Sequence, residues 1–240
     1  SRAASVSALT AGAFDITIQP LWSLYASHFS STSADPSGPK ESEIARTLAL
    51  IGWGGVELSA KRIGFAHKGM AITVNGIAQG FITDRIAQLL RRDGYENVLV
   101  QLGESYAMGR HADGRPWRVG IGSPDGDGAV LTSVSLENRA LATSGGYGSP
   151  FSQDAQHHHL FDPKNGRSAN YYRSISVLAP DATTADALST ALAVTPREYL
   201  KRTLANFSDA RVFLSSNDGE LGWLTHHKSE GDAKEAGRPL

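Results

Sequence analysis

The sequence contains no cysteine among its 240 residues. Disulfide frameworks, thiolate zinc sites and thiol nucleophiles are therefore excluded. A chain without cysteine suits an oxidising compartment, but this composition leaves the compartment open. The sequence also has no G-x-S-x-G and no H-E-x-x-H pattern, so it lacks the nucleophile elbow of the α/β-hydrolases and the zinc-binding helix of common metalloproteases.

Neither sign of charge is in excess, because the sequence has 23 Lys and Arg residues and 24 Asp and Glu residues. It also contains no dense basic run. A nucleic-acid groove or a surface for anionic membranes thus lacks electrostatic support. No apolar stretch approaches the roughly 20 residues that span a bilayer, and the N-terminus lacks the pattern of a signal peptide. We expect no nucleic-acid partner and no direct membrane span, in a protein that is cytosolic or has had a targeting segment removed.

The sequence does contain enough apolar residues, 40% of the chain, to bury a sizeable core. Apolar residues at helical spacing predict helices at 41–52, 82–94, 183–195 and 196–207. Stretches of alternating or β-branched residues, separated by turn-forming GESY, DGRP, SPDGDG and PKNG, predict strands at 97–103, 116–122, 129–136, 139–145, 173–180 and 210–216. Strands outnumber helices and do not alternate with them, which favours an α+β fold with a layered antiparallel or mixed sheet and packed helices.

We expect residues 1–240 to form a single domain with a charged, frayed tail at 228–240. The segment GAFDITIQPLWSLY at 12–25 begins abruptly, which predicts that the domain lacks an N-terminal segment. The four tryptophans are spread through strand-like contexts. We therefore expect them to pack in the core or at its rim.

Residues 74–81, VNGIAQGF, lie between a short apolar run and an amphipathic helix, and they predict a loop. Gly76 and Gly80 would let backbone N–H groups approach a ligand closely, at a helix N-terminus whose partial positive charge suits a pyrophosphate. The segment matches neither standard glycine-rich phosphate motif. Its local pattern alone favours the plainer alternative, a tight turn in which Asn75 caps the helix.

Asp186 and Thr190 are four residues apart and so share one face of the predicted helix 183–195. A carboxylate and a hydroxyl are oxygen ligands that suit Mg²⁺, which keeps several waters and shares its coordination sphere with substrate phosphates. Without further support, the simpler interpretation is a carboxylate that interacts with the helix dipole beside a packed threonine.

Three successive histidines occupy 157–159. Side chains alternate along a strand, so only His157 and His159 would share a face, and a site with three histidine ligands is not expected. His159, near Asp162, could supply a base of near-neutral pKa, or it could be a surface histidine ahead of an Asp-Pro turn.

The segment TSGGYG at 143–148 could surround a planar or phosphorylated ligand with backbone donors and the ring of Tyr147. A glycine-rich hairpin end explains the same residues equally well. This alternative also remains open on the local pattern.

Taken together and in order, eight segments resemble the ApbE family, the FAD:protein FMN transferases. They are GAFDITIQPLW, VNGIAQGFITDRIAQLL, NVLVQLGES, PWRVGIGSP, LATSGGYG, HHHLFDPKNG, SISVLAP and TADALSTAL, and they run from about Gly12 to Val194. The resemblance implies an α+β flavin-transferase fold and a Mg²⁺-dependent transfer of FMN from FAD to a Thr or Ser hydroxyl of a partner protein, with release of AMP. It also implies an exported periplasmic protein, commonly a lipoprotein, and a preceding segment with further flavin contacts.

The resemblance also assigns roles to individual positions. Asp186 and Thr190 match the side-chain ligands of Mg²⁺, and Gly76 matches the residue that donates a backbone carbonyl. Asp186 and His159 are the implied catalytic residues. The implied flavin contacts are Gly76, Ala78, Gln79, Glu104, Thr143, Ser144, Gly145 and Tyr147.

Two positions depart from the family pattern. Gln79 stands where the family loop G-G-I-A-K-G has lysine, and Glu104 lies in GES where the family often has G-G-D. The variant N-G-I-A-Q-G-F is similar to accessory proteins encoded with nitrous oxide reductase, whose expected acceptor is a membrane-anchored protein with an FMN-binding domain. Two alternatives stay open: a non-catalytic periplasmic FAD carrier, and an FAD pyrophosphatase that yields FMN and AMP.

Overall fold

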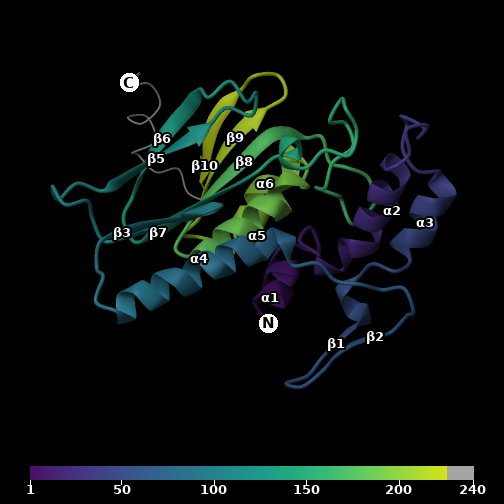
Figure 1. Cartoon of the computed structure of the whole chain (residues 1–240), viewed down its shortest axis with the longest axis horizontal. Coiled ribbons are helices and arrows are strands. Elements are labelled where there is room, and N and C mark those ends of the chain that lie inside the picture. The colour runs from purple at the N-terminus through teal and green to yellow at the C-terminus, as the bar shows by residue number, and fades with distance from the viewer. Residues whose placement is uncertain (226–240) are drawn as a thin grey trace.

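The central element of the fold is a six-stranded sheet, seen in a computed structural model that describes residues 1–225 (Figure 1). The strand order is β10-β9-β8-β7-β4-β3, and every neighbouring pair is antiparallel. Its strands are β3 (Val98–Leu102), β4 (Glu104–Met108), β7 (Arg139–Ser144), β8 (Tyr172–Ala179), β9 (Arg211–Ser216) and β10 (Leu221–Thr225). Two hairpins complete the described strands: β1 (Val56–Leu58) with β2 (Ile63–Phe65), and β5 (Trp117–Gly122) with β6 (Val130–Leu136).

The helices are α1 (Arg2–Leu9), α2 (Gln19–Phe29), α3 (Glu41–Leu48), α4 (Asn75–Arg92), α5 (Ala182–Ala193) and α6 (Arg197–Leu204). Short 3-10 turns lie at Ile16–Ile18, Trp53–Gly55 and Gly146–Gly148. Within residues 1–225, no helix combines the length and the apolar character that a membrane crossing requires.

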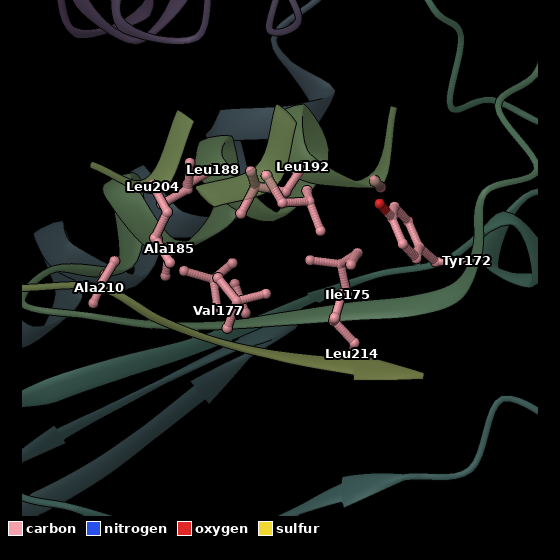
Figure 2. Packing of buried hydrophobic residues seen from close by; sticks show 14 of the residues in the cluster. Tyr172, Ile175, Val177, Ala185, Leu188, Leu192, Leu204, Ala210 and Leu214 are labelled. Carbon is pink, nitrogen blue, oxygen red and sulfur yellow. The ribbon is translucent and has the colours of Figure 1, made fainter. Parts of the chain in front are cut away.

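Helix α5 packs directly on the sheet and forms most of the core with it. Figure 2 shows Leu188 and Leu192 of α5 lying over Ile175 and Val177 of β8, and all four side chains are almost completely buried. Burying one such side chain stabilises a fold by about 1.5–3 kcal/mol. The small residues that alternate with these leucines allow α5 to approach the sheet closely, and the same close packing fixes where Asp186 lies.

The opposite face of the sheet is covered by the β5–β6 hairpin. Ile121 and Leu136 of the hairpin pack against Leu141, Leu178 and Phe213 of the sheet. Strand β8 is therefore covered on both faces, which explains why it is buried along nearly its whole length. The resulting order of layers is helices, sheet and hairpin, which confirms the predicted α+β fold and shows that the main sheet is antiparallel.

Two local predictions were wrong. GESY was expected to be a turn, but Gly103 alone makes the turn, with a φ of +96°, and pairs Leu102 with Glu104 across β3 and β4. Residues 74–81 were expected to be a loop, but α4 begins at Asn75 and includes residues 75–81. Asn75 does not cap the helix either, since Val74 is the cap position and no side chain bonds there. The predicted tail at 228–240 lies outside the described residues.

Candidate functional site

A cavity of about 520 Å³ lies where the first turns of α4, the middle of α5, the ends of β4 and β7, and the loop around residue 159 meet. All eleven residues predicted for the site line it. They are Gly76, Ala78, Gln79, Glu104, Thr143, Ser144, Gly145, Tyr147, His159, Asp186 and Thr190. Segments that are more than 100 residues apart in the sequence, such as Gln79 and Asp186, thus converge on one space.

The two glycines of the VNGIAQG segment allow α4 and α5 to cross at close distance. The two helices lie against each other in Figure 1. A β-carbon at Gly80 would overlap the carbonyl oxygen of Ala182 and would lie 2.8 Å from the β-carbon of Asp186. Gly80 is buried, and its backbone N–H donates to Asp186 Oδ2 at 2.9 Å. This N–H was expected to be available for a ligand, but it holds the carboxylate of Asp186 instead.

Gly76 makes the second close approach, one helical turn earlier. Its φ of −84° and ψ of +16° leave helical geometry and kink the start of α4. A β-carbon here would lie 2.9 Å from Thr190 Oγ1, so only glycine allows the backbone of α4 to lie beside the hydroxyl of Thr190. The three predicted metal ligands, Gly76, Asp186 and Thr190, therefore meet at one side of the cavity.

Two buried carboxyl groups face this side of the cavity. Asp186 is 4% exposed, and burial raises its pKa to about 6, against the opposing effect of the Gly80 N–H. Glu104 is 7% exposed, and its pKa is raised to about 8, first by burial and then by the nearby charge of Asp186, while the Thr143 N–H lowers it. Neither carboxylate forms an ion pair with any residue in 1–225. A bound cation would supply the missing countercharge.

The oxygen atoms at this side of the cavity fit a Mg²⁺ ion. Mg²⁺ takes carboxylate, hydroxyl and carbonyl oxygens and is commonly held by only one or two carboxylates together with substrate phosphates. The described residues contain no group of three or more His, Asp or Glu side chains placed to hold a metal. A Mg²⁺ site made of one or two acidic side chains and neutral oxygens does not need such a group.

The end of β7 is held against α5 by serine hydroxyls. Ser144 Oγ lies 2.8 Å from Ser189 Oγ, and Ser189 donates to the carbonyl of Asp186 at 2.9 Å. Thr143 Oγ1 lies 2.8 Å from Ser176 Oγ on the neighbouring strand. The hydroxyls of Thr143 and Ser144 thus have partners within the protein and fix the wall of the cavity.

The three successive histidines differ in their surroundings, and they lie in a loop instead of the expected strand. His157 packs against the rings of Tyr25 and Phe29. His158 is buried: its Nδ1 accepts from the Leu160 N–H at 3.2 Å and its Nε2 lies 3.0 Å from Asn170 Oδ1. With Nδ1 accepting, the Nε2–H donates to Asn170, and burial lowers the pKa of His158 to about 4. Both side chains have structural partners.

His159 alone lines the cavity. Burial lowers its pKa, opposed by hydrogen bonding to the Ser149 backbone, so the imidazole is neutral near pH 7. Its Nδ1 is buried and has no hydrogen-bond partner among the described residues. A neutral imidazole at a cavity wall is able to accept a proton from a bound group.

Gln79 lies over the turn between β3 and β4. A β-carbon at Gly103 would lie 2.6 Å from Gln79 Nε2, so the amide rests on the backbone of that turn while the residue also lines the cavity. Tyr147 and Trp22 also line the cavity, and these residues are 47% and 39% exposed. We call these two rings the aromatic rim. Trp22 comes from α2, and Tyr147 comes from the segment that follows β7.

Sequence reasoning missed several lining residues: Ile18, Trp22, Thr73, Ser149 and Leu160, and it assigned Asn75 only as a cap. Trp22 was expected in the core or at its rim. Helix α2 buries Leu21 and Tyr25, which are four residues apart and share a face. That spacing could have shown that Trp22 points away from the core.

The model of the ApbE family matches residues 1–214 of the chain. The FAD:protein FMN transferase of Vibrio cholerae is 32% identical over 223 residues, which cover 91% of this chain and 66% of that protein. The FAD:protein FMN transferase of Haemophilus influenzae is 30% identical over 203 residues, which cover 81% of this chain and 58% of that protein. The chain thus spans less than two thirds of the length of these curated relatives.

Two solved structures of ApbE proteins are similar to this chain in fold. The ApbE protein of Thermotoga maritima superposes with a TM-score of 0.82 at 29% identity, over 99% of this chain and 76% of that one. The flavin transferase ApbE from Vibrio cholerae superposes with a TM-score of 0.76 at 27% identity, over 92% of this chain and 71% of that one.

Proposed function

Because the chain belongs to the ApbE family, we propose that it transfers FMN from FAD to a Thr or Ser hydroxyl of a partner flavoprotein, releasing AMP, with Mg²⁺ as cofactor. The observation that carries the proposal is the convergence of Asp186, Thr190 and Gly76 with His159 on one cavity. Relatives named FAD:protein FMN transferase support the reaction class.

The cation would be held by the carboxylate of Asp186, the hydroxyl of Thr190 and the backbone carbonyl of Gly76. When bound, Mg²⁺ supplies positive charge that offsets the pyrophosphate and stabilises the leaving phosphate. The Gly80 N–H keeps Asp186 in position, so the ligand geometry depends on the crossing of α4 and α5.

His159 would take the proton of the acceptor hydroxyl. The hydroxyl oxygen forms a bond to the phosphorus on the FMN side of the pyrophosphate, and the bond from that phosphorus to the bridging oxygen breaks. AMP leaves with the electron pair of that bond. A neutral His159 is competent for this step because burial keeps its pKa below the ordinary value.

The aromatic rim would hold the flavin ring system. Tyr147 and Trp22 present partly exposed faces, and aromatic faces stack on planar ligands. The glycine loop beside Tyr147 adds backbone donors. The cavity therefore offers an acidic end for the diphosphate and an aromatic end for the flavin.

The acceptor and the compartment are part of the same proposal. The resemblance to accessory proteins of nitrous oxide reductase supports a membrane-anchored acceptor with an FMN-binding domain, and a periplasmic protein of the lipoprotein type. Fractionation of cells that produce the whole protein, with immunodetection in the periplasmic and membrane fractions, tests the location.

Mass spectrometry of such an acceptor, after incubation with this protein, FAD and Mg²⁺, tests the reaction. We expect an FMN-sized increment on a Thr or Ser residue and an equal amount of AMP. Intact FAD after long incubation would contradict the proposal in favour of a carrier, and free FMN without any acceptor would contradict it in favour of a pyrophosphatase. Leaving out Mg²⁺ in a parallel sample shows whether the transfer depends on the cation.

A further inference from the structure

The crossing of α4 and α5 continues for one more helical turn beyond the cavity. Three contacts join the two helices, at positions that are four residues apart on each helix and therefore share one face of it. They are Gly76 with Thr190, Gly80 with Asp186, and Asp84 with Ala182. The contacts advance along α4 as they go back along α5, so the two helices run in opposite directions here.

Asp84 makes the last of these contacts, and it does so with both of its carboxylate oxygens. Its Oδ1 accepts from the Ala182 N–H at 2.8 Å, and its Oδ2 accepts from the Thr183 N–H at 2.8 Å and from the Thr183 hydroxyl. The first N–H groups of a helix have no partner within the helix and carry partial positive charge, so a carboxylate bonds well to them. Because two oxygens bond two successive N–H groups, Asp84 restrains both the sliding and the rotation of α5 against α4.

Asp84 lies outside the cavity, one helical turn beyond the contact that holds Asp186. It is not among the residues that line the cavity, so its effect on a bound ligand is indirect. Asp186 Oδ2 accepts from the Gly80 N–H at 2.9 Å, and sliding of α5 along α4 would lengthen this bond. A displacement of about 1 Å in a group of an active site can cost about 100-fold in rate.

We infer that Asp84 is a positioning residue for the cation site. It holds α5 at the place along α4 where Asp186 and Thr190 meet the backbone of Gly76. The inference rests on the proposed function, because that function supplies the divalent cation. Removing a residue that orients metal ligands commonly weakens metal binding by about 10-fold to 100-fold.

Asp181 offers a matched control, because it caps the same turn of α5 from the preceding position in the chain. Its Oδ1 accepts from the Thr184 N–H at 2.8 Å, and its Oδ2 accepts from the Thr184 hydroxyl at 2.9 Å. Asp181 and Asp84 thus make the same kinds of bond to α5, but within residues 1–225 no hydrogen bond joins Asp181 to α4. Asp181→Ala should therefore lower the melting temperature, as Asp84→Ala does, and leave Asp186 in place.

Binding of Mn²⁺ alone to the whole chain, followed by electron paramagnetic resonance, tests the inference, and Asp186→Asn identifies the signal of this site. We expect Asp84→Ala to bind Mn²⁺ about 10-fold more weakly than wild type. Asp181→Ala should stay within about 2-fold of wild type, as is usual for a substitution away from a site. Asp84→Asn keeps one oxygen that can accept from an N–H of α5, so its affinity should lie between those of wild type and Asp84→Ala.

Two results would overturn the inference: Mn²⁺ affinity of Asp84→Ala equal to that of wild type, or equal losses of affinity in Asp84→Ala and Asp181→Ala. Equal losses would mean that a weakened first turn of α5 explains the effect without any contact to α4. Circular dichroism at the assay temperature shows whether each variant is folded. If Asp84→Ala does not fold, the same comparison between Asp84→Asn and Asp181→Asn decides.

The inference and the proposed function fail in different ways. Mn²⁺ that is bound by wild type, lost in Asp186→Asn and fully retained in Asp84→Ala contradicts the role of Asp84 alone. Mn²⁺ binding that depends on Asp84, in a protein that places no FMN on any acceptor, contradicts the transfer and leaves the role of Asp84 standing. A wild-type protein with no Mn²⁺ signal that Asp186→Asn removes contradicts the cation site itself, and the role of Asp84 with it.

Discussion

The cavity has two walls of different character, one helical and one made mostly of loops. The helical wall, where α4 crosses α5, is buried and carries Asp186, Thr190 and Gly76 in close contact. The part of the lining made by α2 and by loops carries the partly exposed rings of Tyr147 and Trp22 together with His159. The helical wall can hold charge in a fixed geometry, and the other wall can accept a flat ligand and an approaching partner. Breaking one wall should therefore produce a different defect from breaking the other.

The largest effect is expected from the helical wall, in the variant Asp186→Asn. Loss of a ligand charge at a catalytic cation removes several kcal/mol of transition-state stabilisation, which corresponds to about 1000-fold or more in rate. The asparagine keeps an oxygen that can accept from the Gly80 N–H, so the fold should survive. AMP release, measured by chromatography, checks the result, and Asp93→Asn at the exposed end of α4 is the matched control. Retained AMP release by Asp186→Asn would contradict the metal assignment.

On the other wall, His159→Gln should reduce FMN transfer by about 100-fold to 10,000-fold, which is typical for loss of a general base. Binding of FAD should not change, because His159 acts on the acceptor hydroxyl. Transfer rates and FAD affinity measured on the same preparation separate these effects. The exposed residue His67 supplies the control His67→Gln, and parallel losses of binding and transfer would show that His159 holds FAD instead.

The variant Gly80→Ala tests the crossing of the two helices. Its β-carbon would overlap the Ala182 carbonyl, so α4 must move away from α5 at a cost of about 1–3 kcal/mol in the free energy of unfolding. Thermal or denaturant unfolding measures this cost. Gly54→Ala is the control, since nothing lies within 4 Å of a β-carbon there. Full stability of Gly80→Ala would mean that the helices are not in close contact.

The buried carboxyl groups predict how stability depends on pH without a cation. The folded pKa values, about 8 for Glu104 and about 6 for Asp186, lie above the ordinary values of 4.5 and 3.8. Such groups favour folding while they are protonated, so stability in EDTA should fall as the pH rises from about 4 to 8. Mg²⁺ should reverse most of the loss at pH 8. A melting temperature in EDTA that rises over this range would contradict the burial of the pair.

The smallest effect is expected at the aromatic rim. Trp22→Leu should weaken FAD binding by about 2-fold to 10-fold, since an aromatic pair contributes about 0.5–1.5 kcal/mol beyond its buried area. The control Tyr95→Leu changes an exposed ring that lies outside the cavity. A loss as large as that of Asp186→Asn would remove the distinction between the two walls.

Much of the fold follows from local pattern. The expected strands at 97–103, 116–122 and 129–136 correspond to β3, β5 and β6, and the expected helix at 183–195 corresponds to α5. The periods of two and 3.6 residues are properties of single elements, so they are visible in the chain. The start of α4 was mistaken for a loop because two glycines normally weaken a helix, and only the packing against α5 explains them.

The site was predictable as a set of residues and less so as a geometry. The eight segments in family order predicted eleven site residues, and all eleven line the cavity. The roles of these residues stay predictions. What the sequence could not provide was the pairing of Glu104 with Asp186, which depends on a one-residue turn and on a crossing of two helices. It also could not provide the physical reason that sets His159 apart from His158, which is that Asn170 bonds His158 while His159 lines the cavity.

The central claim is that the start of α4 and the middle of α5 meet around one divalent cation. Crystals grown with FAD and Mn²⁺, a substitute for Mg²⁺ that scatters anomalously, test it directly. The account predicts an anomalous peak bonded to an oxygen of Asp186, to Thr190 Oγ1 and to the carbonyl of Gly76, next to the pyrophosphate. Bound FAD with no peak at these three groups, or with the cation elsewhere, would contradict it.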